Sequence, residues 1–214
     1  MSRYPLIRLG DICAKITDGT HHSPQSFPTG EFKYITAKNI KPGRLDLRDL
    51  TFVNAATHAE IYARCDVRLN DVLIVKDGAT TGRVALNRLS EPFSLLSSVG
   101  VLRPGPEVIS PYLAYALQEP ETLRRLLDRL SGVAITRVTL QKLQEHLIAV
   151  APRPSQLRIV ELLDEVLADL DDAVTELQIA RLKLAQYFVW ADFRTLGHAR
   201  CNCAEHIQAS PRPS

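Results

Sequence analysis

Short apolar runs separated by turn residues fill the first part of the chain. Three regions, at residues 32–36 ("FKYIT"), 71–86 ("DVLIVKDGATTGRVAL") and 94–102 ("SLLSSVGVL"), contain such β-branched or apolar runs, which alternate along the chain with turn residues. Such runs are typical of strands connected by loops. The pattern therefore predicts a sheet at the core.

Other stretches have helical spacing. Residues 56–65 ("ATHAEIYARC") predict a short amphipathic helix, and "YLAYALQ" and "ETLRRLLDRLSG" follow Pro111. In the last of these, four leucines share one face before Gly132: Leu123, Leu126, Leu127 and Leu130. These helices are expected to pack on one side of the sheet. Residues 1–150 are thus predicted to form one α+β domain, mostly β at its centre.

The segment "APRPS", residues 151–155, is predicted to be a stiff junction, because its two prolines interrupt regular structure and Ser155 is suited to cap a following helix. Residues 156–190 then contain neither Gly nor Pro. We expect the junction and a long helix to occupy residues 151–193, and residues 194–214 to be a disordered tail.

The long helix carries a heptad repeat. Its a and d positions alternate steps of three and four, and they are Val160, Leu163, Leu167, Leu170, Val174, Leu177, Arg181, Leu184 and Phe188. This seam predicts a coiled coil in which Arg181 influences register or partner choice. The alternative is an amphipathic helix that folds back on its own domain.

Composition indicates a soluble, cytoplasmic protein. The chain has 214 residues, lacks the run of roughly 20 apolar residues that crosses a bilayer, and its start lacks the apolar region of a secretory signal. Its four cysteines are too few and too unevenly spaced for a disulfide framework, so reduced thiols are expected. The motif "CNCAEH", residues 201–206, offers three soft metal ligands without a fourth, and a polar tail is the favoured interpretation.

Charge divides the chain at the same junction. Residues 1–154 carry 20 Lys and Arg against 15 Asp and Glu, a net +5, whereas residues 155–214 carry 6 against 9, a net −3. The acidic residues of the helix include an uninterrupted set: Glu161, Asp164, Glu165, Asp169, Asp171, Asp172 and Glu176. A polyanion would meet the front of the molecule, although ordinary scatter of solvated charge is the alternative.

The stretch "ITDGTHHSP", residues 16–24, could be a metal site, a catalytic cluster or a shaped loop. One hypothesis is a metal-dependent hydrolase that uses Asp18, His21 and His22. Adjacent histidines in an extended segment point to opposite sides, however, and no further ligands lie nearby in sequence. Neither a serine elbow, a P-loop nor a glycine-rich cofactor fingerprint is present, so no cofactor is expected.

Three short loops share a composition that suits nucleic acid. "TDGTHHSP", "TAKNI" and "KDGATTGR" combine glycine or turn residues with the hydroxyls, amides and cations that bond phosphate oxygens and base edges. The candidate DNA contacts are Thr17, Thr20, His21, His22, Lys38, Asn39, Lys76, Thr80, Thr81 and Arg83. Asp18, Gly19, Asp77 and Gly78 are expected to make turns.

These residues carry a resemblance. The order "RLGDICAKITDGTHHSP", "YITAKNI", "LNDVLIVKDGATTGRVAL", "SLLSSV", "SPYLAYAL" and "SGVAITRVTLQKLQEHLIAVAPRPSQLRIVELLDEV" is similar to the specificity subunit of type I restriction-modification systems. The resemblance implies a noncatalytic subunit in which recognition domains read double-stranded DNA. It also implies long helices that dock the adenine methyltransferase subunits, with a restriction and translocase subunit as a further partner.

Typical members of that family carry two recognition domains and two long helices, whereas one of each is predicted here. The resemblance therefore implies a half-subunit completed by a second copy of itself through antiparallel helices. The third hypothesis, beside DNA recognition and the hydrolase, is a pure assembly protein. In that case the long helix alone would carry the function.

Overall fold

The computed structural model describes residues 3–128 and 137–201, with side chains described up to Phe188. It divides into two compact units, one ending at Glu161 and the other beginning at Leu162. The predicted positions of Leu130 and Gly132 lie outside the described residues, as does the tail from residue 202 onward. The mixed architecture of sheets followed by a long helix confirms the predicted fold class.

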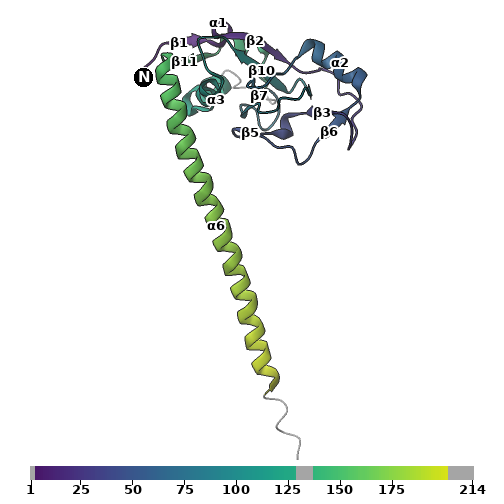
Figure 1. Cartoon of the computed structure of the whole chain (residues 1–214), viewed down its shortest axis with the longest axis vertical. Coiled ribbons are helices and arrows are strands. Elements are labelled where there is room, and N and C mark those ends of the chain that lie inside the picture. The colour runs from purple at the N-terminus through teal and green to yellow at the C-terminus, as the bar shows by residue number, and fades with distance from the viewer. Residues whose placement is uncertain (1–2, 129–136, 202–214) are drawn as a thin grey trace, which may run out of the picture. The chain divides into compact units, whose positions relative to one another are not determined.

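A four-stranded antiparallel sheet forms the centre of the first unit (Figure 1). Its strands, in spatial order, are β2 (Cys13–Asp18), β10 (Val99–Pro104), β7 (Val72–Val75) and β8 (Val84–Leu86). Every side chain of β7 is buried, because this strand lies inside the sheet and both of its faces are covered. The sheet confirms the strands predicted in residues 71–86 and 94–102.

A second sheet has three strands, and two short ribbons complete the unit. The three strands are β6 (Thr51–Val53), β3 (Phe32–Ile35) and β9 (Ser94–Leu95), with β3 antiparallel to β6 and parallel to β9. The ribbons pair β1 (Leu6–Arg8) with β11 (Leu147–Ala149), and β4 (Ile40–Lys41) with β5 (Arg44–Leu45). The ribbon strands were missed because two or three residues are too few for an alternating pattern to show.

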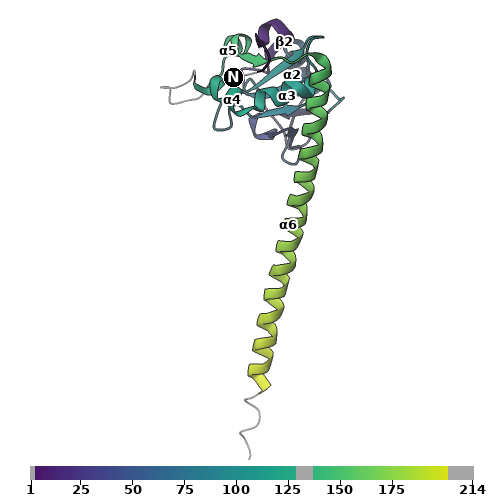
Figure 2. The ribbon, with the colours of Figure 1, turned by 90° about the vertical axis from the view of Figure 1, so that its left-hand side faces the viewer.

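Short helices surround these sheets. They are α1 (Leu9–Ile12), the 3-10 turn η1 (Ala37–Asn39), α2 (Ala55–Arg64), α3 (Ser110–Gln118), α4 (Pro120–Asp128) and α5 (Leu140–Glu145). Helices α3 and α4 follow one another in the chain and contact each other (Figure 2). The positions of α2, α3 and α4 confirm the helices predicted from apolar spacing.

The hydrophobic core consists of two clusters on opposite faces of the four-stranded sheet. Alternation along β7 sends Val72 and Ile74 into one cluster and Leu73 and Val75 into the other. Helices α1, α3, α4 and α5 supply side chains to the first cluster, whereas β3, β4 and β9 supply the second. The predicted packing of helices on one side of the sheet is therefore confirmed for α3 and α4.

The last helix, α6, spans Arg153–Cys201 and begins earlier than the sequence predicts. Pro154 lies in its first turn, where the missing N–H is one that would have no acceptor within the helix. Ser155 is therefore inside the helix, and its predicted role as a cap is wrong. At the other end α6 continues past residue 193 to Cys201, so the predicted tail is partly helical.

Gln156 ties the beginning of α6 to the first unit. Its side chain is fully buried, and Oε1 accepts a hydrogen bond from the backbone N–H of Ile109 at 3.0 Å. Nε2 donates to the carbonyl oxygens of Glu107 at 2.9 Å and Ala151 at 2.8 Å. Tyr112 adds a hydroxyl bond to the carbonyl of Ala149 at 2.8 Å. The junction is thus held by buried polar contacts.

Beyond Glu161, the described side chains of α6 are exposed up to Phe188. The exposed fractions of the seam residues include 54% for Leu170, 70% for Leu177 and 72% for Phe188. Val160 differs, because it packs partly against the first core cluster. Within the described residues, α6 and the other helices all lack a stretch apolar enough to cross a bilayer.

We expect Gln156→Ala to lower the free energy of unfolding of the first unit by about 2–4 kcal/mol, because it leaves one N–H and two carbonyls without their buried partner. Urea denaturation followed by circular dichroism measures this change. Gln144→Ala, at an exposed glutamine of α5, is the matched control and should change stability by less than about 0.5 kcal/mol. Equal losses in both variants would contradict the assigned role of Gln156.

Candidate nucleic-acid interface

The loop that follows β2 is fixed against the end of β9 and the residues just after it. The N–H of Thr20 donates to the carbonyl of Leu95 at 2.8 Å, and the N–H of Ser97 donates to the carbonyl of Thr20 at 2.8 Å. A Cβ at Gly19 would lie 1.9 Å from the carbonyl oxygen of Leu95, so only glycine permits this approach. Gly19 therefore allows close packing, and its predicted role in a turn is wrong.

Asp18, the last residue of β2, is a buried charge rather than a turn former. Its Oδ2 accepts a hydrogen bond from Lys76 Nζ at 2.6 Å, and its Oδ1 accepts one from Arg64 Nη2 at 2.7 Å. Asp18 and Lys76 are only 1% and 3% exposed. The ion pair therefore joins the end of β2 to the residue that follows β7.

The strand between these two residues makes the pair possible. Gly100 of β10 is paired with Asp18 on one side and with Ile74 on the other. A Cβ at Gly100 would lie 3.0 Å from Lys76 Cδ, so the lysine stem lies directly over the glycine. The small residue leaves the space through which Lys76 reaches Asp18.

Electrostatics at Asp18 favour the ionised carboxylate and disfavour a metal ion. Burial opposes the charged form, but hydrogen bonds from Lys76 and Arg64 outweigh it and hold the pKa of Asp18 below its ordinary value. Both carboxylate oxygens already face cations, which would repel a metal ion. Within residues 3–128 and 137–201, no group of three or more His, Cys, Asp or Glu is arranged to hold one. The geometry therefore argues against the hydrolase hypothesis.

Helix α2 positions Arg64 beside Asp18. Asn54 caps the helix by accepting a hydrogen bond from the N–H of Thr57 at 2.8 Å. His58 is buried, stacks on Phe32 with ring centroids 3.9 Å apart, and lies 3.0 Å from Ser94 Oγ through Nδ1. Burial lowers the pKa of His58, so the neutral ring is favoured there. This face of α2 orients its last turn, which carries Arg64.

Two of the predicted DNA contacts need correction. Lys76 is buried and bonded to Asp18, so its ammonium is not available to DNA in this structure. Asn39 is 2% exposed, and its Nδ2 donates to the carbonyls of Asp46 and Asp49 at 3.1 and 3.0 Å. Its Oδ1 also accepts from the N–H of Thr36 at 3.1 Å. Both residues maintain the shape of a loop. From the sequence alone, a lysine or asparagine with this role cannot be distinguished from one that contacts DNA.

The other predicted contacts remain predictions, with different degrees of access. His21, His22, Lys38 and Arg83 are exposed. The threonines are partly buried, and they are Thr17, Thr20, Thr80 and Thr81. The structure brings His21 within 3.4 Å of Asp18 and 3.0 Å of Arg64, whereas Lys38 forms a separate ion pair with Asp49 at 3.0 Å.

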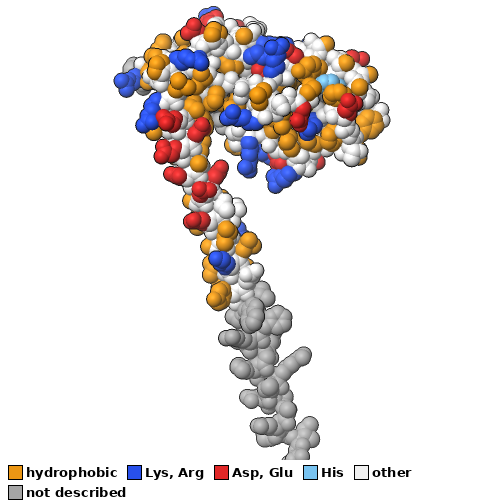
Figure 3. Space-filling view, in the orientation of Figure 1, with side chains coloured by type: hydrophobic (Ala, Val, Ile, Leu, Met, Phe, Trp, Pro, Cys, Tyr) orange, Lys and Arg blue, Asp and Glu red, His pale blue; other side chains and the backbone are white. Residues whose placement is uncertain are grey.

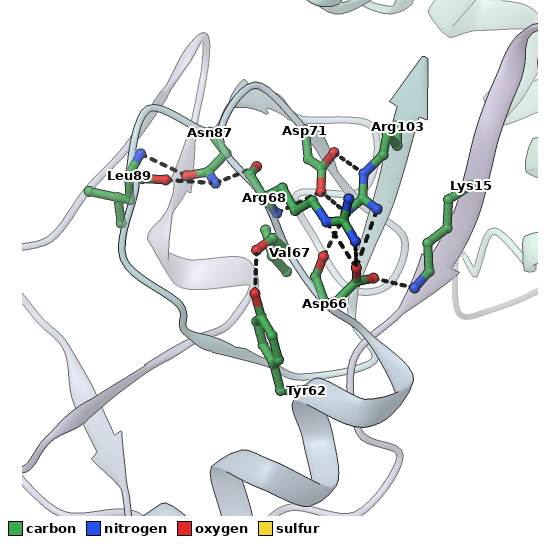
Figure 4. Close-up of polar contacts among 9 residues, drawn as sticks. All are labelled: Lys15, Tyr62, Asp66, Val67, Arg68, Asp71, Asn87, Leu89 and Arg103. Atoms are coloured by element: carbon green, nitrogen blue, oxygen red, sulfur yellow. Dashed lines mark hydrogen bonds and ion pairs between the residues drawn. The ribbon is translucent and has the colours of Figure 1, made fainter. Parts of the chain in front are cut away.

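A second ionic cluster joins β2, β10 and the segment before β7 (Figure 4). Arg103 makes two hydrogen bonds to Asp71, from Nε at 2.9 Å and from Nη2 at 2.8 Å. Asp66 accepts hydrogen bonds from Lys15 and, at 3.0 Å, from Arg68 Nε. The Lys15 ammonium holds the pKa of Asp66 at about 2.

Neither Arg64 nor this second cluster is predictable from the sequence. Asp18 and Arg64 are 46 positions apart, and Arg103 lies 32 positions from Asp71. No local spacing predicts such pairs, because folding alone brings them together. In the view of Figure 3, basic and acidic side chains are interspersed over the first unit, while acidic ones predominate on the described start of α6.

We expect Asp18→Asn to lower the free energy of unfolding by about 3–5 kcal/mol, because it leaves the buried Lys76 ammonium without a carboxylate. Urea denaturation measures the loss. The double variant Asp18→Asn with Lys76→Met should recover most of it, since the uncompensated charge is then removed. If the double variant were as unstable as the single one, the buried charge would not be the cause.

Known proteins place this architecture in a family. The family model described as "Type I restriction modification DNA specificity domain" matches residues 1–181. A chain from a structure of the complex assembly and conformational transition of a type I R-M system is 24% identical, with a TM-score of 0.56. The alignment covers 93% of this chain and 45% of that one.

Two further structures are similar. The HsdS subunit from Thermoanaerobacter tengcongensis is 20% identical with a TM-score of 0.56, covering 78% of this chain and 38% of that one. The type I restriction-modification S subunit from M. genitalium is 19% identical with a TM-score of 0.52, covering 84% and 44%. No curated protein has significant sequence similarity to the chain.

The chain thus spans less than half the length of these three structures. At such identities their similarity establishes the fold alone, and it agrees with the four-stranded sheet and long helix described above. The family model covers both the first unit and most of the described part of α6. The chain belongs to the family of type I restriction-modification DNA specificity domains.

Proposed function

We propose that this chain is a DNA-recognition half-subunit of a type I restriction-modification system, acting in the cytoplasm and without catalytic activity of its own. Its first unit would read one short half-site of double-stranded DNA. Its α6 helix would join a second copy and dock an adenine methyltransferase subunit and a restriction subunit. The family match over residues 1–181 is the observation that carries this proposal.

The uncovered seam of α6 supports a partner helix. Leu163, Leu167, Leu170, Val174, Leu177, Leu184 and Phe188 are all between 36% and 72% exposed. A strict heptad of apolar side chains becomes stable when a second helix inserts its own side chains between them. Because the chain has about half the length of its structural relatives, an identical copy is the simplest partner.

Two copies would be related by a two-fold axis. An antiparallel pairing of the α6 helices would place one recognition domain at each end. Each domain would read its half-site mainly in the major groove, where each base pair presents a distinct pattern of donors and acceptors. Identical domains in this arrangement imply an inverted-repeat target with an unread spacer.

The acidic residues of α6 suggest that the helix and the first unit bind different partners. Glu161 to Glu176 contain seven acidic residues without a basic one, and all of these are exposed. Their charge would repel DNA phosphates and would suit a basic surface on the methyltransferase subunit. The first unit, with its net positive charge, would then be the part that meets DNA.

We expect sequence-specific adenine methylation only when this chain is present with a cognate methyltransferase subunit. Each protein would be expressed alone and together in a host without methylation, and long-read sequencing would identify modified adenines. An inverted-repeat motif would support the homodimer. Methylation by the methyltransferase alone, or none by the pair, would contradict the proposed function.

Spacer length should follow the length of α6. Deleting residues 168–174, one heptad, preserves the seam and shortens the helix by about 10 Å, which corresponds to about three base pairs. The methylated motif should then have a spacer shorter by about that number. The matched control deletes five residues, 168–172, which turns the rest of the seam by about 140° around the helix and should abolish the dimer in light scattering. An unchanged spacer after the heptad deletion would count against helix-set spacing.

A further inference from the structure

Residues 64–68, from the last residue of α2 into the segment before β7, alternate outward-facing and buried side chains. Cys65 and Val67 are 1% and 3% exposed and belong to the second core cluster. Arg64 and Arg68 keep 49% and 65% of their side chains exposed. The segment therefore presents an arginine at each of its ends.

Two cations, Lys76 and Arg64, surround the single carboxylate of Asp18, so one of them is not neutralised. Lys76 alone suffices to neutralise Asp18, because the two form a buried pair at 2.6 Å. Arg64 binds the other carboxylate oxygen at 2.7 Å from a half-exposed position. The three side chains have a net charge of +1, and the exposed cation among them is Arg64.

The second cluster repeats this imbalance around Arg68 (Figure 4). Arg103 neutralises Asp71 through two hydrogen bonds, and Lys15 neutralises Asp66. Arg68 is the third cation facing these two carboxylates, and its side chain is the most exposed of the three. One positive charge is again left over, and it lies at the surface.

The backbone that carries both arginines is held rigidly by inward hydrogen bonds. The carbonyl of Asp66 accepts from Arg103 Nη2 at 2.6 Å, and that of Val67 accepts from the Tyr62 hydroxyl at 3.3 Å. The carbonyl of Arg68 accepts from Asn87 Nδ2 at 2.8 Å. A ligand would meet a preformed surface, so little ordering entropy would be lost on binding.

The guanidinium groups are themselves oriented. Arg64 donates from Nη2 to Asp18 Oδ1 and from Nε to the carbonyl of Asp18 at 3.4 Å. Arg68 donates from Nε to Asp66 Oδ2 at 3.0 Å, and its Nη2 forms an ion pair with the same oxygen at 2.8 Å. In the part of the chain that the structure describes, neither arginine has a hydrogen bond at Nη1.

We propose that residues 64–68 bind the DNA backbone, with Arg64 and Arg68 each donating from Nη1 to a phosphate oxygen. The inference rests on the proposed function. An oriented guanidinium group whose Nη1 has no hydrogen bond can donate to a single phosphate oxygen. Recognition of guanine, by contrast, requires two donor nitrogens of one arginine at the same time. The segment would position the duplex without reading its sequence, and Asp18 and Asp66 would act as positioning residues.

Salt dependence of DNA binding tests this inference. The full chain and its variants would be titrated onto a fluorescein-labelled duplex of arbitrary sequence, by fluorescence anisotropy over a series of NaCl concentrations. Arg64→Gln and Arg68→Gln should each weaken binding about tenfold. Each should also reduce the slope of log K against log [NaCl] by about 0.9, the value for one lost phosphate contact.

Matched variants separate a local contact from a general charge effect. Arg158→Gln at the start of α6 removes the same charge from an exposed ion pair with Glu161, and its slope should equal that of the wild type. Arg64→Lys and Arg68→Lys keep the charge and should keep most of the slope. Unchanged urea midpoints would establish that the variants are folded.

The outcomes distinguish this inference from the proposed function. A wild-type chain that binds DNA, with slopes unaltered by Arg64→Gln and Arg68→Gln, would overturn the backbone contact and leave DNA recognition standing. A wild-type chain with no salt-dependent binding would overturn both. Loss of methylation at the target motif with normal binding to arbitrary duplex would assign the arginines to base reading instead, which also overturns the inference.

Discussion

The buried ion pair between Asp18 and Lys76 is the contact on which the proposed DNA-facing side of the domain depends. It connects the ends of β2 and β7 across β10, and neither charge can be hydrated where it lies. The two loops that contain most of the predicted DNA contacts begin at these two residues. Loop position is therefore set from inside the sheet, because separating the pair would leave two unsolvated charges.

The same logic extends to the edges of the domain. Asp66 and Asp71 hold cations from neighbouring strands, and Gln156 satisfies backbone groups of the segment before α3. In each case a polar side chain fixes the position of a connecting segment that is neither helix nor strand. The hydrophobic clusters supply the driving force for folding, while these polar contacts decide where the connecting segments lie.

Apolar periodicity was enough to predict β7, β8 and β10 of the central sheet, the helices α2 to α4 and the long helix, but not β2. These elements bury a repeating face, so their spacing is visible in a single chain. The candidate nucleic-acid interface could not be predicted in this way, because it consists of polar residues. Lys76 and Asn39 have the side chains of a nucleic-acid contact, yet both are buried, and Arg64 had no local signal at all. The role of a polar residue depends on partners that only the fold brings near.

Lys38 and Asn39 are neighbours in the chain with opposite surroundings, since one is exposed and the other is enclosed by the loop it supports. Hidden residues of this kind maintain the backbone, so the exposed neighbour is not required for folding. A domain built in this way can exchange its outward side chains one at a time during evolution. New specificities could then arise by point substitution while the scaffold stays intact.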